Sequence, residues 1–320
     1  MTALPTQPGQ LRPLDHATGR TKSRALRRCR ETLITASLII CGLFSILTTF
    51  AIIGVLLEET RRFFTMPDVS MREFFLTATW QPLLGAEKHF GIWPLVCGTM
   101  LVTGVAALLA LPLGLITAIY LSEYAPERLR GFLKPVLEIL AGIPTVVYGF
   151  FALTVITPTL QRAGVAVDSY NALSAGLAVG IMTLPIVCSL SEDALRAVPR
   201  TLREGAFACG GTRLDVSLRV VLPAALSGVI ASFLLAIARS IGETMIVALA
   251  AGGLAQLTLD PRDQVQTMTG YMVQIFLGDA SAAGVEYRSS YAVAFMLFAM
   301  TLVVTLVGYR IMKRFREEYQ

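Results

Sequence analysis

The chain has 320 residues, of which 54% are hydrophobic and only 15% are charged, with a mean hydropathy of +0.65. A soluble domain carries about 25% charged residues, so this composition excludes an ordinary soluble protein and indicates a membrane protein. The formal net charge is +5, but the positions of the basic residues are more informative than their sum. The five cysteines and two histidines have neither metal-binding nor disulfide-framework spacing, so we expect free thiols and no metal.

The N-terminal segment 1–32 is basic and precedes a long apolar run at 33–57. Residues 1–19 are rich in Pro, Gly, Gln and Thr, a composition typical of disorder. The apolar run exceeds the roughly 7–15 residues of a signal-peptide core, and no small-residue cleavage site follows it. It therefore predicts an uncleaved first transmembrane helix. A basic cluster beside a span is a topological anchor, so no nucleic-acid partner is expected.

Five further apolar stretches complete an all-α membrane protein with six predicted spans. They lie at 92–120, 136–160, 172–190, 224–249 and 291–309. Four prolines in this region are expected to bend or break helices, which spans tolerate when neighbours satisfy the freed backbone groups: Pro94, Pro112, Pro144 and Pro185. In the fourth span, Gly176 and Gly180 form a G-x-x-x-G pattern that allows close helix approach.

The distribution of the 27 basic residues predicts the orientation. Most lie before the first span and after the second, fourth and sixth spans. Because cytoplasmic loops carry an excess of Lys and Arg, both termini are predicted to be cytoplasmic. Segments 58–91 and 253–290 are then extracytoplasmic loops. The second of these loops has apolar residues at helical spacing, which predicts a short amphipathic helix: Val265, Met268, Met272 and Ile275.

The cytoplasmic segment 191–223 is patterned as a helix, a glycine turn and a second helix. Pro199 suits the start of the first helix, and Gly210 with Gly211 suits its end. The second helix is predicted from about Leu214 to Pro223. This pattern favours a segment that presents a short helix to a cytoplasmic partner.

Glu-Gly-Ala is followed after three residues by Gly and after nine more by Val-x-Leu-Pro. This spacing resembles the EAA loop of binding-protein-dependent ABC importer permeases, in which the loop forms a coupling helix that docks in a groove of the ATPase subunit. Gly205 stands where the motif has its first alanine, and Val220 where it has isoleucine. The resemblance implies a type I importer permease (MetI-like) fold and assigns ATPase coupling to Glu204, Gly205, Ala206, Gly210, Leu222 and Pro223.

Further stretches resemble the phosphate-specific permeases of the PstC type. They are Trp-Gln-Pro at 80–82, Leu-Ser-Glu-Tyr-Ala-Pro at 121–126, and the segments 137–151, 190–195, 238–244 and 265–269. The resemblance covers about 74–315 and implies a permease core at 92–315 that contains the coupling loop. It also implies that the chain is one permease subunit of an inorganic phosphate importer in the bacterial inner membrane.

The resemblance also implies the partners. They are a homologous permease of the PstA type, two copies of an ATPase of the PstB type, and an extracytoplasmic phosphate-binding protein of the PstS type, within membrane lipid. None of the four lysines follows a glycine, so the chain has no G-x-x-x-x-G-K-[ST] phosphate loop. We therefore expect a non-catalytic subunit without a cofactor, with ATP bound by the partner ATPase.

Arg239 and Glu243 are the candidate substrate-path residues. They are four residues apart in the predicted fifth span, so on a helix they would share a face. An ionisable residue inside a span costs at least about 2.5 kcal/mol and usually faces the bundle interior or a water-filled path. The guanidinium fork suits a tetrahedral oxyanion, so Arg239 is predicted to meet the anion and Glu243 to neutralise it between substrates. The alternative is a purely structural ion pair.

Other functions stay open at this point. The substrate could be molybdate, sulfate or phosphonate, or the chain could be the sister A-type subunit. An ion-coupled secondary transporter would need no EAA-type loop. A membrane enzyme would need a metal, nucleophile or nucleotide motif that the sequence lacks.

Overall fold

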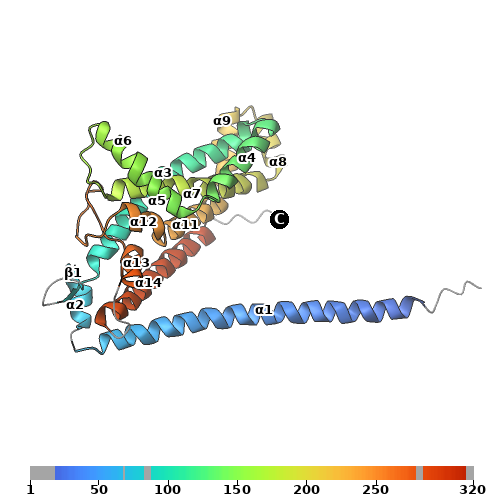
Figure 1. Cartoon of the computed structure of the whole chain (residues 1–320). Helices are drawn as coiled ribbons and strands as arrows, with labels where there is room; N and C mark the ends of the chain where they lie inside the picture. Colours follow the sequence, from blue (N-terminus) through green and yellow to red (C-terminus); the bar gives the residue numbers. More distant parts are fainter. Residues whose placement is uncertain (1–18, 68, 83–87, 279–283, 315–320) are drawn as a thin grey trace, which may run out of the picture. The chain divides into compact units, whose positions relative to one another are not determined.

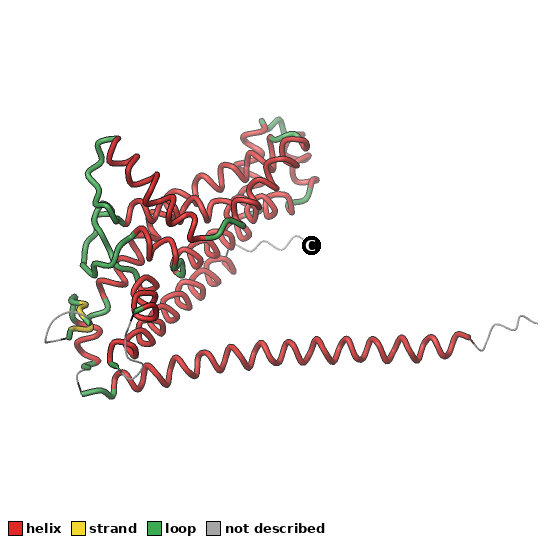
Figure 2. Tube along the Cα trace, in the orientation of Figure 1, coloured by secondary structure: helices red, strands yellow, loops and turns green. Residues whose placement is uncertain are grey.

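The computed structural model describes the backbone of residues 19–67, 69–82, 88–278 and 284–314, with side chains from Arg30 onward. Most of the predicted tail, residues 1–18, and the end of the predicted core at 315 lie outside the described residues. Helices make up most of the described chain, as Figure 2 shows. The chain divides into two compact units, Met1–Val55 and Leu56–Gln320.

Helix α1 (Gly19–Phe64) contains the predicted first span and continues beyond it. Its last turns are polar, yet they stay helical because Glu58 pairs with Arg61 at 3.1 Å and with Arg62 at 3.0 Å. Such pairs, three and four residues apart, support a helix where the apolar run has ended. The segment 58–91 therefore begins as helix and becomes irregular only after Phe64.

Helices α3 (Trp93–Ile119) and α7 (Ala172–Ala197) correspond to the predicted second and fourth spans. Helix α3 continues into a wider π-helical turn, η1 (Tyr120–Tyr124). Helices α3 and α7 continue through Pro112 and Pro185, so of the expected bend or break these two prolines cause no break. Pro94 occupies the first turn of α3, where its missing N–H has no helical partner in any case.

The glycine pattern of α7 is confirmed as a packing device. A Cβ atom on Gly176 would lie 2.6 Å from the Cβ of Val105 in α3. One on Gly180 would lie 2.9 Å from a methyl carbon of Leu109 and 3.1 Å from the carbonyl oxygen of Ala106. The two backbones are therefore too close for any larger residue at these positions.

The predicted third span is broken. Helix α4 (Glu127–Ala141) is followed by α5 (Thr145–Phe151), a π-helical turn η2 (Ala152–Ile156) and α6 (Thr157–Arg162), and the chain bends by 88° between α4 and α5. The break expected at Pro144 is thereby confirmed, and the bent pair can still form the one span predicted at 136–160. Gly142 ends α4, and Pro144 takes an extended conformation that cannot continue the helix.

The predicted fifth span is also interrupted. Segment 200–224 forms α8 (Arg200–Ala208), α9 (Arg213–Val216), a π-helical turn η3 (Ser217–Val221) and α10 (Leu222–Ala224). A bend of 71° separates residues 213–224 from α11 (Leu226–Ile241). Residues 242–244 then part α11 from α12 (Met245–Ala250), so the predicted span at 224–249 consists of two helices.

Segments 58–91 and 253–290 contribute to a common core. Helix α2 (Met71–Leu76) leads to the antiparallel strands β1 (Trp80–Gln81) and β2 (His89–Phe90), and α13 (Met268–Leu277) precedes α14 (Val285–Arg314). Trp80 and Tyr271 meet edge to face with ring centroids 4.9 Å apart. Met268 and Ile275 are buried, which confirms the predicted amphipathic helix, although Val265 precedes its first residue.

Among the described residues, four helices are long and apolar enough to cross a membrane, and the count reaches six if each bent pair forms one span. Within the unit 56–320, Figure 1 shows α8 and α9 at the end of the helix bundle opposite α2 and β1. Helix α3 runs between these ends. This arrangement separates the segment 58–91 from the segment 200–216, as the predicted orientation requires.

We predict that Gly176→Ala destabilises the isolated protein in detergent, because the added methyl group must push α3 away from α7. Overpacking of this kind costs about 1–3 kcal/mol. Gly104→Ala is the matched control, because Gly104 lies on α3 with open space around its Cα. Thermal unfolding should show a lower midpoint for Gly176→Ala alone, and equal midpoints would contradict the close packing.

Candidate functional site

Helix α8 is the most exposed part of the predicted coupling loop. Glu204 and Gly205 are exposed, and so are the apolar side chains of Leu202 and Phe207. Ala206 is half-buried and packs against the core cluster that includes Leu121 and Val216. One side of α8 therefore packs against the bundle, and the other offers a mixed apolar and acidic surface.

Gly210 determines how α8 ends. Its φ of +86° lies in the left-handed region, where a residue with a Cβ atom is strained. The next amide, Gly211 N–H, donates to the carbonyl oxygen of Ala206 at 3.2 Å, so the chain turns back on the helix. The predicted order of helix, glycine turn and helix is confirmed. The second helix is divided: α9 passes into η3, and Leu222 and Pro223 belong to α10.

A reciprocal cap fixes the start of α9. The Thr212 side chain accepts from the backbone N–H of Asp215, and the Asp215 carboxylate accepts from the backbone N–H of Thr212. The Thr212 hydroxyl also donates to that carboxylate, and this hydrogen bond lowers the pKa of Asp215 below its usual value. The cap keeps the turn after α8 in one conformation.

Arg203 faces the opposite way from the exposed residues of α8. Its guanidinium donates to the Glu123 carboxylate at 3.1 Å and to the carbonyl oxygens of Val198 at 2.6 Å and Leu195 at 2.8 Å. Only 17% of the Arg203 side chain and 11% of the Glu123 side chain are exposed. Arg203 therefore joins α8 to the end of α7 and to η1.

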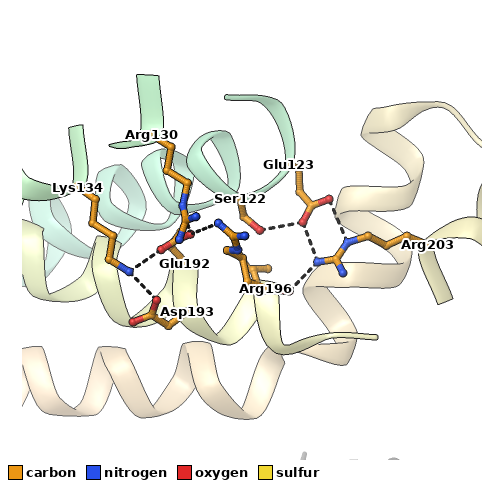
Figure 3. A network of polar contacts seen from close by, with 9 residues as sticks. Ser122, Glu123, Arg130, Lys134, Glu192, Asp193, Arg196 and Arg203 are labelled. Atoms are coloured by element: carbon orange, nitrogen blue, oxygen red, sulfur yellow. Dashed lines mark hydrogen bonds and ion pairs between the residues drawn. The ribbon is translucent and has the colours of Figure 1, made fainter. Parts of the chain in front are cut away.

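Glu192 is the centre of the neighbouring charge cluster, drawn in Figure 3. Its carboxylate accepts from Arg130 Nε at 2.8 Å and from Lys134 Nζ at 3.0 Å, and Arg196 lies 3.7 Å away. The Glu192 side chain is 1% exposed, so its charge depends on these cations for solvation. Lys134 also donates to the exposed Asp193 at 2.7 Å. These contacts fasten α4 to α7.

Sequence reasoning did not find this cluster. In the sequence, its three cations (Arg130, Lys134 and Arg196) indicated only the orientation of the chain, and Glu192 was only part of a stretch that resembles the family. One available signal was an acidic residue at the end of an apolar helix, because such a residue needs a cationic partner. The identity of those partners depends on how α4 folds back beside α7.

An open cleft of about 430 Å³ lies beside these contacts. It is bordered by η1, the start of α4, the end of α7 and α8. Its charged lining residues are Glu123, Glu127, Arg130, Arg196, Arg200, Arg203 and Glu204. The charged contacts at the base of α8 are therefore reached by water on one side.

Arg239 and Glu243 do not form the expected pair. Helix α11 ends at Ile241, so Glu243 falls in the break before α12 and the expectation of a shared helical face is wrong. Among the described residues, no carboxylate lies within the 4.0 Å ion-pair distance of Arg239. Glu243 is buried, and its carboxylate accepts from the Ile246 N–H at 3.4 Å. It thereby caps α12.

The two residues occupy different surroundings. Thr269 Oγ1 donates to the carbonyl oxygen of Glu243 at 2.6 Å, which ties the break to α13. The Arg239 side chain is exposed, with Met182 Sδ at 3.7 Å from one guanidinium nitrogen. The structure thus places a guanidinium without a carboxylate partner among the described residues in the last turn of a candidate span, and a structural carboxylate just beyond it.

A second cavity, of about 340 Å³, lies near this break. Its polar lining consists of neutral groups within the described residues: the side chains of Tyr170, Gln264, Gln266 and Gln274 and the backbone of Gly252 and Gly253. The side-chain N–H₂ of Gln266 donates to Oε1 of Gln274 at 2.6 Å. This contact uses the amide oxygen of Gln274 and not the two N–H donors of its amide nitrogen.

These features define a helical membrane subunit that presents a short, firmly held helix outside its spans. Residues 110–317 match the family described as binding-protein-dependent transport system inner membrane component, and the chain belongs to that family. The predicted importer-permease class and fold are thereby confirmed.

Relatives of similar length support this assignment. The probable ABC transporter permease protein YqgH of Bacillus subtilis is 32% identical over 90% of this chain and 92% of its own. The phosphate transport system permease protein PstC of Xylella fastidiosa is 31% identical over 73% of this chain and 76% of its own. The corresponding probable protein of Methanocaldococcus jannaschii is 30% identical over 77% and 82%.

Solved structures share the fold. A bacterial ABC transporter involved in the import of alginate has a chain that matches 92% of this one and 100% of its own, with a TM-score of 0.64 and 14% identity. A chain of the MetNI methionine ABC transporter matches 71% of this one and 98% of its own, with a TM-score of 0.55 and 18% identity. At these identities the likeness establishes the fold alone.

We predict that Glu192→Gln destabilises the protein, because Arg130 and Lys134 lose the buried charge that they share. Removing one partner from a buried charged network costs about 3 kcal/mol, less where the cations reach water. Asp193→Asn is the matched control, because Asp193 is 57% exposed and an exposed pair contributes about 0–1 kcal/mol. Thermal unfolding in detergent measures both, and a loss as large for Asp193→Asn would contradict the central role of Glu192.

Proposed function

We propose that this chain is a membrane-spanning permease subunit of an ATP-driven importer of inorganic phosphate, of the PstC type. The observation that carries the proposal is α8, a short exposed helix locked onto the bundle by Arg203 and ended by Gly210. The family match and the relatives named as phosphate permeases support it. The chain has no phosphate loop, so the helix would meet an ATPase on a separate subunit.

The exposed residues of α8 suit a docking role. Leu202 and Phe207 are 36% and 45% exposed in the single chain, and Glu204 lies between them. Exposed apolar side chains with polar residues beside them are typical of a surface that a partner covers. We infer that an ATPase subunit covers it, through the residues that match the family motif: Glu204, Gly205, Ala206, Gly210, Leu222 and Pro223.

The proposed complex contains a homologous permease, two ATPase copies and an extracytoplasmic phosphate-binding protein. A protein whose exposed surface includes Leu108, Ile116 and Leu306 in apolar helices needs lipid or a second permease around it. Both termini would be cytoplasmic, which directs α8 to the cytosol and the core around Trp80 to the binding protein. ATP would be bound by the ATPase alone, and this subunit would hold no cofactor and catalyse no reaction.

Arg239 is the proposed contact for the anion in transit. Its guanidinium is exposed at the last turn of α11 and has no carboxylate partner among the described residues. A cation in this position is favourable only beside water, a second chain or an anionic substrate. Glu243, in the break between α11 and α12, would border the same path. Because its carboxylate accepts from the Ile246 N–H, Glu243 must change conformation before it can neutralise Arg239.

The proposal is tested by phosphate uptake in proteoliposomes that contain this chain with its permease, ATPase and binding-protein partners. We expect uptake that depends on ATP, with unlabelled phosphate competing far better than molybdate, sulfate or phosphonate. Competition led by another oxyanion would reassign the substrate within the family. Gradient-driven uptake by the single chain without ATP would refute the importer assignment in favour of a secondary transporter.

We predict that Arg239→Lys lowers the maximal uptake rate by about tenfold, because an ammonium cannot give the forked hydrogen bonds of a guanidinium. If Arg239→Lys imports phosphate at the normal rate, Arg239 is a structural residue and not the contact for the anion. Arg162→Lys is the matched control, because Arg162 is an exposed arginine at the end of α6 with no carboxylate partner in the described part of the chain. ATPase retention on the membrane confirms that each variant assembles.

A further inference from the structure

The backbone at the junction between α7 and α8 does little to fix the orientation of one helix relative to the other. Val198 and Pro199 are both extended, with ψ of 129° and 141°, so the helical hydrogen-bond pattern stops between α7 and α8. Proline offers no N–H that could close the gap. At its C-terminal end, α8 is followed by the glycine turn at Gly210. A helix with such ends can tilt unless side chains hold it.

Arg203 supplies that hold through three separate contacts. The carbonyl oxygens of Leu195 and Val198 belong to the last turn and the cap of α7, where helical N–H donors run out, although Leu195 also accepts from the Val198 N–H at 3.4 Å. The Glu123 carboxylate belongs to η1, which continues from α3 without interruption. One guanidinium therefore bonds the ends of the two helices that pack most closely in the bundle.

Glu123 is held for this contact. The hydroxyl of Ser122 donates to its Oε1 at 2.9 Å, and the Ala125 N–H donates to the carbonyl oxygen of Tyr120 at 2.9 Å across the π-helical turn. The carboxylate thus belongs to the rigid end of α3. A displacement of α8 pulls on α3 directly, and through the α7 carbonyls it pulls on α7 as well.

We propose that the Arg203–Glu123 contact is the joint that transmits motion of α8 to the α3–α7 pair, with Arg203 and Glu123 as positioning residues for transport. The inference rests on the proposed function, since it assigns α8 the docking of an ATPase. Glu123 and Arg203 themselves line the adjacent cleft of about 430 Å³, so the joint lies beside open space into which α8 has room to move. Breaking the joint lets α8 follow the ATPase without the spans following α8.

The test compares Glu123→Gln, Arg203→Gln and the double variant in the reconstituted complex. ATPase retention, ATP hydrolysis and uptake are measured together, so the number of ATP molecules hydrolysed per anion imported is known. Each single variant should retain the ATPase and its hydrolysis within about twofold, while uptake falls about tenfold or more, in line with loss of a charged hydrogen bond. The double variant should be no worse than the worse single variant, because both remove the same contact.

Glu127→Gln is the matched control. Glu127 lines the same cleft but is exposed and has no ion-pair partner in the described ranges. The complex that carries Glu127→Gln should therefore show normal uptake and normal coupling. If a glutamine variant does not reach the membrane, Glu123→Asp is measured instead, because it keeps the charge and withdraws the carboxylate by one methylene. It should uncouple in the same way.

Normal coupling in the single variants would overturn the proposed joint. A fall in uptake in the double variant equal to the product of the two single falls would also overturn it. So would loss of the ATPase from the membrane, because Arg203 would then only shape the docking surface. The readout is uptake of whichever anion the unaltered complex imports. A wrong substrate assignment therefore leaves this test valid, whereas normal coupling in a phosphate-importing complex removes the joint alone.

Discussion

The close contact between α3 and α7 is the constraint on which the rest of the structure depends. Gly176 and Gly180 remove the side chains that would separate the two helices, and Gly114 does the same near Val187. In a membrane, where lipid is as apolar as the side chains, packing of this closeness is the main source of helix association. The resulting pair gives the broken helices around it a firm surface to pack on.

The charged contacts at one end of this pair extend its rigidity to the parts outside the spans. Glu192 holds α4 against α7, because Arg130 and Lys134 of α4 both donate to its buried carboxylate. Glu123 holds α8 in place together with the end of α7, because Arg203 donates both to the Glu123 carboxylate and to the carbonyl oxygens of Leu195 and Val198. The exposed helix is thus positioned by the spans rather than by its own short sequence. A docking helix must keep its place on the bundle if a partner's motion is to reach the membrane.

The breaks in the third and fifth predicted spans have a shared physical cause and different consequences. Both follow a glycine that ends a helix, Gly142 in one and Gly242 in the other. The first break turns α4 toward α7 and creates the charge cluster. The second leaves Glu243 to cap α12 and ends α11 soon after Arg239. Interrupted spans of this kind persist only where protein or water satisfies the freed backbone groups.

The sequence by itself determined the membrane class, the positions of the long helices, the amphipathic α13, the glycine packing and the helix–turn–helix of the coupling loop. These features depend on local composition and spacing, which a single chain displays directly. Only the tertiary structure decided that Arg239 and Glu243 part at a helix break, and that Glu192 and Glu123 gather cations from distant segments. An ion pair needs two side chains within about 4 Å, and the distance between segments far apart in sequence is set by the bends at Gly142 and Pro144.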